Sequence, residues 1–325
     1  MEIRKIESSL IIRKEEFPII YHTWYCKDSG EEFEDEAMLE TNLRQAMDQY
    51  RSKHNLPFPE EIKEIREQYG ISAAKMSEVL RLGINQFKQY EHGELPSESN
   101  ASLILLARNP KDFCQLVEWS NLAEEEKKQL ISKAKILGET TNSLTQREWT
   151  TKLLMRSLNP DVERGFRRPD PYRFAIMTRF FASRLSTVYK TQMNKLLFYA
   201  DFCHFRNHGR SISGSKYRAI AMGPVPDNFD SLFQFAENEG FVKLEHYEYD
   251  NGTIGTKFLP GEKDEALDDL ETFSLQTVYE RFKNTKSQEI INISHNEDAW
   301  RKNVGSHALI SYLESYCIKG VDNFS

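Results

Sequence analysis

The sequence predicts a mainly α-helical fold with small β elements, in which a five-helix domain precedes a C-terminal α+β domain. Three observations lead to this prediction. Residues 71–96 contain two short helical stretches around a tight turn and end in glycine and proline. Apolar residues recur at helical spacing again between 173 and 204, whereas strand composition is confined to short segments. A hydrophobic fraction of 39% over 325 residues supports more than one core.

Residues 1–57 are expected to form a small β unit followed by a helix. Residues 10–12 and 19–25 have strand composition, and residues 34–54 have apolar side chains at helical spacing. The run Leu56–Pro59 then ends this segment, because proline lacks an amide donor and restrains the residue before it.

Residues 58–120 are expected to form a domain of five short helices. Ser72 is placed to cap the second helix, and Gly93 to end the third. Asn109 and the proline after it start the fifth. The apolar side chains where the first three helices would cross are Ile62, Ile65, Met76, Val79, Leu80, Phe87 and Tyr90.

The remaining chain is read as a helical linker, 121–168, and a C-terminal domain, 169–325. The linker contains a flexible joint at GETTNSLTQ, residues 138–146. In the C-terminal domain we expect helices at 173–188, 192–204 and 267–283, a strand at 241–249 and a turn at 250–252.

The second and third helices of the five-helix domain form a helix-turn-helix pattern, whose second helix lies in the DNA major groove. Asn and Gln side chains match the donor and acceptor edge of adenine, Lys reaches guanine or phosphate, and a helix N-terminus binds phosphate. The candidate DNA-contacting residues are Ser72, Lys75, Asn85, Gln86, Lys88 and Gln89. The segment is not basic, so phosphate contacts would give a modest, salt-sensitive affinity.

Residues Leu82–Ile84, Tyr90–Gly93 and the serines at 97 and 99 resemble the Xre-type helix-turn-helix of MqsA-like antitoxins. That resemblance implies DNA binding. Those antitoxins also carry zinc-binding CxxC pairs ahead of this domain. Here Tyr25 to Phe33 is similar to the second pair, but Ser29 stands in place of its second cysteine and the first pair is absent. Because structural zinc needs four good ligands, we predict no zinc.

Charge is unevenly distributed around the net value of −7. Residues 145–218 carry 15 basic and 5 acidic side chains, and residues 219–325 carry 9 basic and 19 acidic ones. The basic segment is either a surface for an anionic partner or the internal partner of the acidic segment that follows. Four scattered cysteines, no membrane-length apolar run and no secretory signal predict a cytoplasmic protein with free thiols.

An aromatic-rich helix, a Gly/Ser turn, a short strand and a rigid Gly-Pro-x-Pro elbow follow one another from residue 195 to 226. One helix face would bury Tyr199, Phe202 and Phe205, with Asp201 and Arg206 off that face. The run Lys195–Asp201, then Gly214, Tyr217, Gly223–Pro226, Ser294-His295 and Ala299-Trp300 resemble the Panacea domain of SocA-like and GepA-like proteins.

The Panacea resemblance, over about 170–305, implies an antitoxin module that binds and neutralises a protein toxin. It does not identify the contact residues. From expected exposure we choose Arg206, Arg210, Tyr217, Arg218, Pro224 and Pro226 as toxin-binding candidates.

Other chemistry is set aside. His204 and His208 have the spacing of two metal ligands, but no Glu lies between them as in HExxH. Cys203 lacks a nucleophile signature, and Gly252–Thr256 is not a phosphate loop. We therefore predict no catalytic residue, metal or cofactor.

The expected function is that of a type II antitoxin with two partners, a cognate protein toxin and operator DNA. The protein would bind the operator as a homodimer and so repress its own operon. The alternatives are an adaptor that delivers a toxin to a protease, with the tail 318–325 as its docking segment, a hydrolase or nuclease that uses the histidines, and a transcription regulator with a sensor domain.

Overall fold

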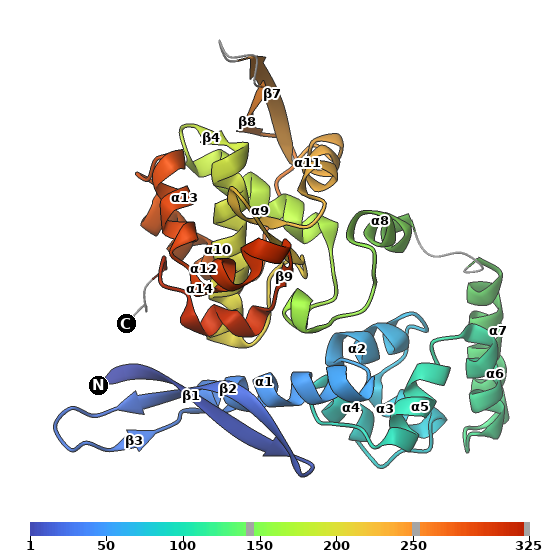
Figure 1. Cartoon of the computed structure of the whole chain (residues 1–325). Coiled ribbons are helices and arrows are strands. Elements are labelled where there is room, and N and C mark those ends of the chain that lie inside the picture. The colour runs from blue at the N-terminus through green and yellow to red at the C-terminus, as the bar shows by residue number, and fades with distance from the viewer. Residues whose placement is uncertain (141–145, 249–253, 322–325) are drawn as a thin grey trace. The chain divides into compact units, whose positions relative to one another are not determined.

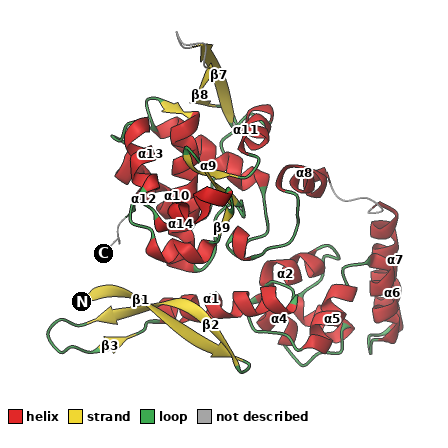
Figure 2. Ribbon diagram, viewed as in Figure 1, coloured by secondary structure: helices red, strands yellow, loops and turns green. Residues whose placement is uncertain are grey.

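The computed structural model describes residues 1–140, 146–248 and 254–321. Within it the chain forms two compact units. The larger unit contains residues 1–10, 18–45 and 148–325, and the smaller unit contains residues 11–17 and 46–147. Helices predominate and the sheets are small and three-stranded, which confirms the predicted fold class (Figures 1 and 2). The predicted joint at 138–146 and the turn at 250–252 fall largely or wholly outside the described residues.

The first residues form two long strands and a helix. The predicted strands lengthen to β1 (Glu2–Ile12) and β2 (Glu15–Tyr25), with β3 (Glu32–Phe33) completing the sheet β1-β2-β3. Helix α1 (Glu36–His54) starts two residues later than expected and passes from the larger unit into the smaller one.

The five predicted short helices all form in the smaller unit. Ser72 accepts a hydrogen bond from the Lys75 amide at 3.2 Å, and Asn109 accepts one from the Lys111 amide at 2.9 Å, so both act as the predicted caps. The helices are α2 (Pro59–Glu67), α3 (Ala73–Val79), α4 (Gln86–Glu91), α5 (Glu98–Leu106), α6 (Pro110–Trp119) and, after them, α7 (Glu124–Thr140).

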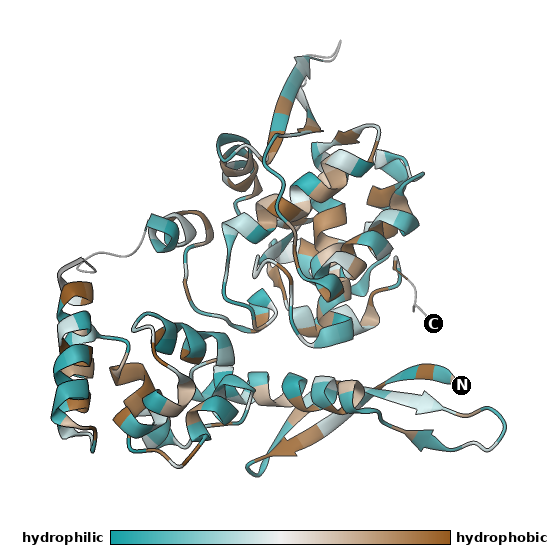
Figure 3. Ribbon diagram, turned by 180° about the vertical axis from the view of Figure 1, so that it is seen from behind, coloured by the Kyte–Doolittle hydropathy of each residue, from teal (hydrophilic) through white to brown (hydrophobic). Residues whose placement is uncertain are grey.

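One core joins these helices. All seven side chains predicted to lie at the helix crossings are buried in it. Behind them Arg51, which is 1% exposed, pairs with Asp48 at 2.7 Å and donates to the carbonyl oxygen of Gly93 at 2.5 Å. This contact fixes the chain where it leaves α4. Figure 3 shows hydrophilic and hydrophobic stretches along the same helices, as amphipathic segments with one buried face require.

The larger unit is built around helix α10 (Lys190–His208). Its residues from Gln192 to Arg206 are all buried, including Asp201 and Arg206, so the expectation of a polar face off the core is wrong. Several other helices and strands of this unit pack against it. The unit's other helices after α1 are α8 (Gln146–Met155), η1 (Val162–Arg164), α9 (Pro171–Arg184), α11 (Phe229–Asn238), α12 (Asp269–Phe282), α13 (Ser287–His295), α14 (Asp298–Asn303), η2 (Val304–Ser306) and η3 (Tyr312–Cys317).

Two further antiparallel sheets complete this unit, with orders β4-β8-β7 and β6-β5-β9. The strands are β4 (Val188–Tyr189), β5 (Tyr217–Ile220), β6 (Gly223–Pro226), β7 (Val242–Glu248), β8 (Ile254–Pro260) and β9 (Leu309–Ile310). Helix α9 ends at Arg184, before the predicted 188, because Leu185 has extended backbone and Val188 pairs with Phe258.

The predicted Gly-Pro-x-Pro elbow is a strand. Residues Gly223–Pro226 form β6, whose Val225 pairs with Arg218 and whose Pro224 pairs with Ala219. β6 is an edge strand, and an edge accommodates proline because one row of amides needs no partner. The strand packs against α10, and all four of its residues are buried.

Candidate functional site

Asp201 of α10 holds the loop that leads to β5. Its side chain is fully buried. The amides of Ile212 and Ser213 donate to Oδ1 at 2.7 and 2.9 Å. The hydroxyls of Ser213 and Tyr217 donate to Oδ2 at 2.6 and 2.8 Å. Burial raises the pKa of Asp201, while these four donors favour the carboxylate. A single carboxylate therefore organises residues 212–217.

Lys195, two turns earlier on α10, holds β6. Its ammonium is fully buried and donates to the carbonyl oxygen of Pro224 at 2.9 Å. Desolvation lowers the pKa of Lys195 to about 7. Gly223 is required beside it, since its φ is +95° and a Cβ there would lie 2.6 Å from both Lys195 Cε and Ser294 Oγ. The strand thus approaches the helix as closely as its backbone allows.

Tyr199 of the motif and Glu297, which lies between the two parts of its closing segment, hold residues 319 and 320. The Tyr199 hydroxyl donates to Glu297 Oε1 at 3.0 Å. Glu297, 1% exposed, also accepts from the amides of Gly320 at 2.7 Å and Lys319 at 2.8 Å. Burial raises the pKa of Glu297. The Glu297 carboxylate, at the start of α14, thereby links residues 319 and 320 to Tyr199 of α10.

The closing motif packs as a pair of rings. His295 stacks on Trp300 with ring centroids 4.0 Å apart and planes at 9°. The indole nitrogen of Trp300 donates to the carbonyl oxygen of Ile220 at the end of β5, at 2.8 Å. Burial, and secondarily the charge of Lys195, lower the pKa of His295. Together with Asp201, Lys195 and Glu297, these contacts make the motif a scaffold.

Four of the six toxin-binding candidates are not exposed, which corrects the expectation on which they were chosen. Tyr217 is 0% exposed, because its hydroxyl reaches Asp201. Arg206, 5% exposed, donates to the carbonyl oxygens of Ile318 and Val321. Pro224 and Pro226 are buried in β6. Arg210 and Arg218 remain partly exposed, and Arg218 pairs with Asp227 at 3.2 Å.

Several cations of the basic segment 145–218 pair with the acidic segment after it. Arg167 and Arg173 both donate to Glu271, a buried carboxylate on α12. Arg179 pairs with Asp264 at 2.9 Å and Lys190 with Asp230 at 2.8 Å. Of the two interpretations of the charge pattern, pairing with the acidic segment therefore describes part of this segment.

His204 and His208 lie on the last turns of α10. Their centroids are 4.6 Å apart, and His204 Nδ1 lies 2.9 Å from Ser274 Oγ. Burial lowers the pKa of His204 well below its ordinary value and that of His208 to about 4. Within residues 1–140, 146–248 and 254–321, no group of three or more His, Cys, Asp or Glu could hold a metal ion.

The DNA-contacting candidates occupy the start of α3 and the length of α4. Ser72, Asn85, Lys88 and Gln89 are exposed, whereas Gln86 is partly exposed and donates to Glu94 Oε2 at 3.2 Å. Asn85 has a φ of +61° and supplies no side-chain cap to α4. The lysine candidate of α3 is engaged, because Lys75 pairs with Glu78 at 2.7 Å and Glu126 at 3.1 Å.

The turn at residues 26–31 has one cysteine, Cys26, where a zinc-binding CxxC pair has two. The amide of Cys26 donates to the carbonyl oxygen of Glu31 at 2.9 Å, and Gly30 has a φ of +72°. Hydrogen bonds from the Ser29 hydroxyl, and then from the amides of Ser29 and Asp28, lower the pKa of Cys26 to about 7. One thiol and one serine do not fit a tetrahedral zinc site.

Residues 193–301 match the family model described as antitoxin SocA-like, Panacea domain. The match covers α10 to α14, and with them the contacts of Lys195, Asp201 and Glu297. It supports a role related to toxin–antitoxin systems. Searches of curated proteins and of solved structures found no match to the chain. The helices of the described part include none long and apolar enough to cross a membrane.

Sequence reasoning missed three residues of this scaffold, Ser213, Tyr217 as an internal donor, and Glu297. A carboxylate inside an aromatic-rich helix was an available signal, since Asp201 there requires donors from elsewhere. The identity of those donors was not available, because they come from a loop and a strand that only the fold brings together.

Proposed function

We propose that this protein is an antitoxin that binds and neutralises a cognate protein toxin through its larger unit and represses its own operon through α3 and α4. The match of residues 193–301 carries the proposal. The internal contacts support it, since a scaffold tied by Asp201, Lys195 and Glu297 presents a rigid surface and binding to a rigid surface costs less entropy. No catalytic step is required, and the proposed location is the cytoplasm.

Neutralisation is tested with the reading frame next to this gene. Expression of that neighbour alone should arrest growth, and co-expression of the full chain should restore it. The amount of toxin in the co-expressing cells should stay constant, and the two purified proteins should form a complex. Growth arrest that persists on co-expression contradicts neutralisation, and toxin loss that requires a protease favours the adaptor alternative.

DNA binding is proposed from the exposed positions of Lys88 and Gln89 on α4 and of Ser72 at the start of α3. A dimer would place two such helices on a palindromic operator. The Glu78 and Glu126 carboxylates around Lys75 reduce the positive charge on this face, so phosphate contacts should contribute little affinity and the salt dependence of binding should be shallow.

The operator test uses a fragment that spans the gene's own promoter in a gel-shift titration at two salt concentrations. Gln89→Ala should cost about 1–3 kcal/mol if the side chain reads a base. Lys88→Ala should weaken binding to all fragments and reduce the salt dependence. Lys111→Ala, at an exposed residue of α6, is the matched control. Equal affinity for the promoter and for unrelated DNA argues against operator recognition.

A further inference from the structure

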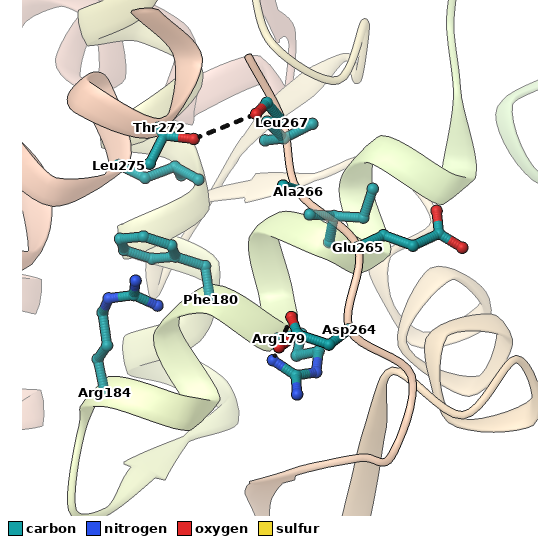
Figure 4. A pocket seen from close by; sticks show the side chains of 10 residues that line it. Arg179, Phe180, Arg184, Asp264, Glu265, Ala266, Leu267, Thr272 and Leu275 are labelled. Atoms are coloured by element: carbon teal, nitrogen blue, oxygen red, sulfur yellow. Dashed lines mark hydrogen bonds and ion pairs between the residues drawn. The ribbon is translucent and has the colours of Figure 1, made fainter. Parts of the chain in front are cut away.

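A small pocket in the larger unit lies between α9, the segment 264–267 and the first turns of α12 (Figure 4). Its volume is about 130 Å³. That is close to the roughly 150 Å³ of an engineered apolar cavity that holds benzene. Ile176, Phe180, Leu267 and Leu275 supply an apolar lining. The space therefore suits one branched aliphatic or aromatic side chain.

The rim of the pocket carries a guanidinium with no acidic partner among the described residues. The Arg184 guanidinium carbon lies 3.7 Å from the centroid of the Phe180 ring, and Nη1 donates to the neighbouring Ser183 Oγ at 3.5 Å. Arg167, Arg173 and Arg179 of the same segment each have a carboxylate. In Figure 4 Arg184 lies beside Phe180, while the carboxylate of Glu265 points away.

A second arginine at the pocket, Arg179, can also pair with a carboxylate of a partner protein. Arg179 pairs with Asp264, whose side chain is 74% exposed, and the buried Nε of Arg179 has no hydrogen-bond partner. An ion pair with so exposed a carboxylate contributes little stability. A partner carboxylate could replace Asp264 or join Arg184 with little loss.

We infer that this pocket is a docking site for a protein segment that places a bulky apolar side chain beside an acidic one. The apolar side chain fills the pocket, and the carboxylate pairs with Arg184. The inference rests on the proposed function, in which the segment belongs to the toxin. An acidic side chain is favoured because the Arg184 guanidinium at the rim is positively charged and planar, and a planar guanidinium can bind a carboxylate by two hydrogen bonds.

The test measures binding of the full chain to the neighbouring gene product by calorimetry. Arg184→Glu, at an exposed residue, should weaken binding at least about tenfold, the loss expected for one charge-assisted contact. Ala266→Trp should weaken it similarly by filling the pocket without changing charge. Lys243→Glu, 64% exposed on β7, is the charge control and should bind as the wild type does. Wild-type affinity in both pocket variants overturns the inference and leaves the proposed function intact.

A second arm does not depend on that gene product. Phage-displayed random heptapeptides are selected on the immobilised full chain, with Ala266→Trp as the counter-selection. Enrichment of peptides that pair an acidic residue with Leu, Ile or Phe, and that fail to bind Arg184→Glu, supports the pocket. Absence of such enrichment overturns it. A chain that selects these peptides but does not bind the neighbouring product would instead contradict the proposed partner.

Discussion

Lys195 and Pro224 are joined by a hydrogen bond of 2.9 Å from a buried ammonium to a buried carbonyl oxygen. The contact ties the second turn of α10 to the middle of the edge strand β6. The amide of Ala219, which lies opposite Pro224 in β5, donates instead to the carbonyl oxygen of Ala308 at 3.0 Å. An ionisable group thus performs a structural task, and desolvation is the cause of its lowered pKa.

Replacing Lys195 by methionine should change how stability depends on pH. Burial lowers the pKa of Lys195 from 10.5 to about 7, so between these values the unfolded chain binds more protons than the folded one. Wild-type stability should therefore rise as pH increases from 7 to 10.5, by up to about 5 kcal/mol at about 1.4 kcal/mol per pKa unit. Urea unfolding at several pH values should show this rise reduced in Lys195→Met. Parallel pH curves for the two proteins would contradict the assignment.

Asp201→Asn should destabilise the larger unit by about 2–4 kcal/mol, because an amide cannot accept four hydrogen bonds and its NH2 group would face donors. Chemical denaturation followed by fluorescence measures the effect. Asp230→Asn is the control, since Asp230 is 69% exposed and its pair with Lys190 should contribute less than about 1 kcal/mol. A similar loss in both variants would mean that burial of Asp201 is not what matters.

The local features of the fold could be predicted from the sequence. Caps such as Ser72 and Asn109 act within three residues of their own position, so the residue types alone place the helix starts. The buried positions of Met76 and Phe87 follow from helical spacing in the same way. The Panacea-like segment was likewise recognisable from its motifs.

The exposure of the predicted binding residues could not be obtained in this way. Tyr217 is buried because residues 212–217 fold back onto Asp201, a contact across 16 positions. Pro224 looked like part of an elbow because its strand partners, β5 and Lys195, lie elsewhere in the chain. The pocket beside Arg184 is formed by α9 and α12, so no local pattern could indicate it.

Acidification should destabilise the protein through His22, which is buried, and His208, which is partly buried. Burial lowers the pKa of His22 to about 4 and that of His208 to about 4, with the charge of Lys5 as a further cause at both. As pH falls from about 6.5 to 4, these histidines are protonated in the unfolded chain but not in the folded chain, so stability is lost in that window. His22 alone should account for about 3 kcal/mol.

Thermal unfolding between pH 4.5 and 7.5 measures this loss. His208→Gln should reduce the slope, because it removes one of the groups that titrate, whereas His92→Gln, at an exposed residue of the smaller unit, should leave it unchanged. The carboxylates contribute equally to all three proteins. An unaltered slope in His208→Gln would show that the pKa of His208 is not lowered in the folded chain.

Gly214→Ala should cost far more stability than Gly30→Ala, although both glycines have nearly the same backbone conformation, with φ of +68° and +72°. At either position alanine is strained by about 1–2 kcal/mol. At Gly214 a Cβ would also lie 2.7 Å from Pro169 Cα and 2.8 Å from the carbonyl oxygen of Arg168, whereas nothing lies within 4 Å at Gly30. Backbone has to move to admit it, and the loop that Asp201 binds has to move with it, so we expect a total of about 3 kcal/mol or more. Urea denaturation of the two variants measures the difference, and equal losses would mean that strain at φ, not the approach of residues 168–169, makes glycine necessary at 214.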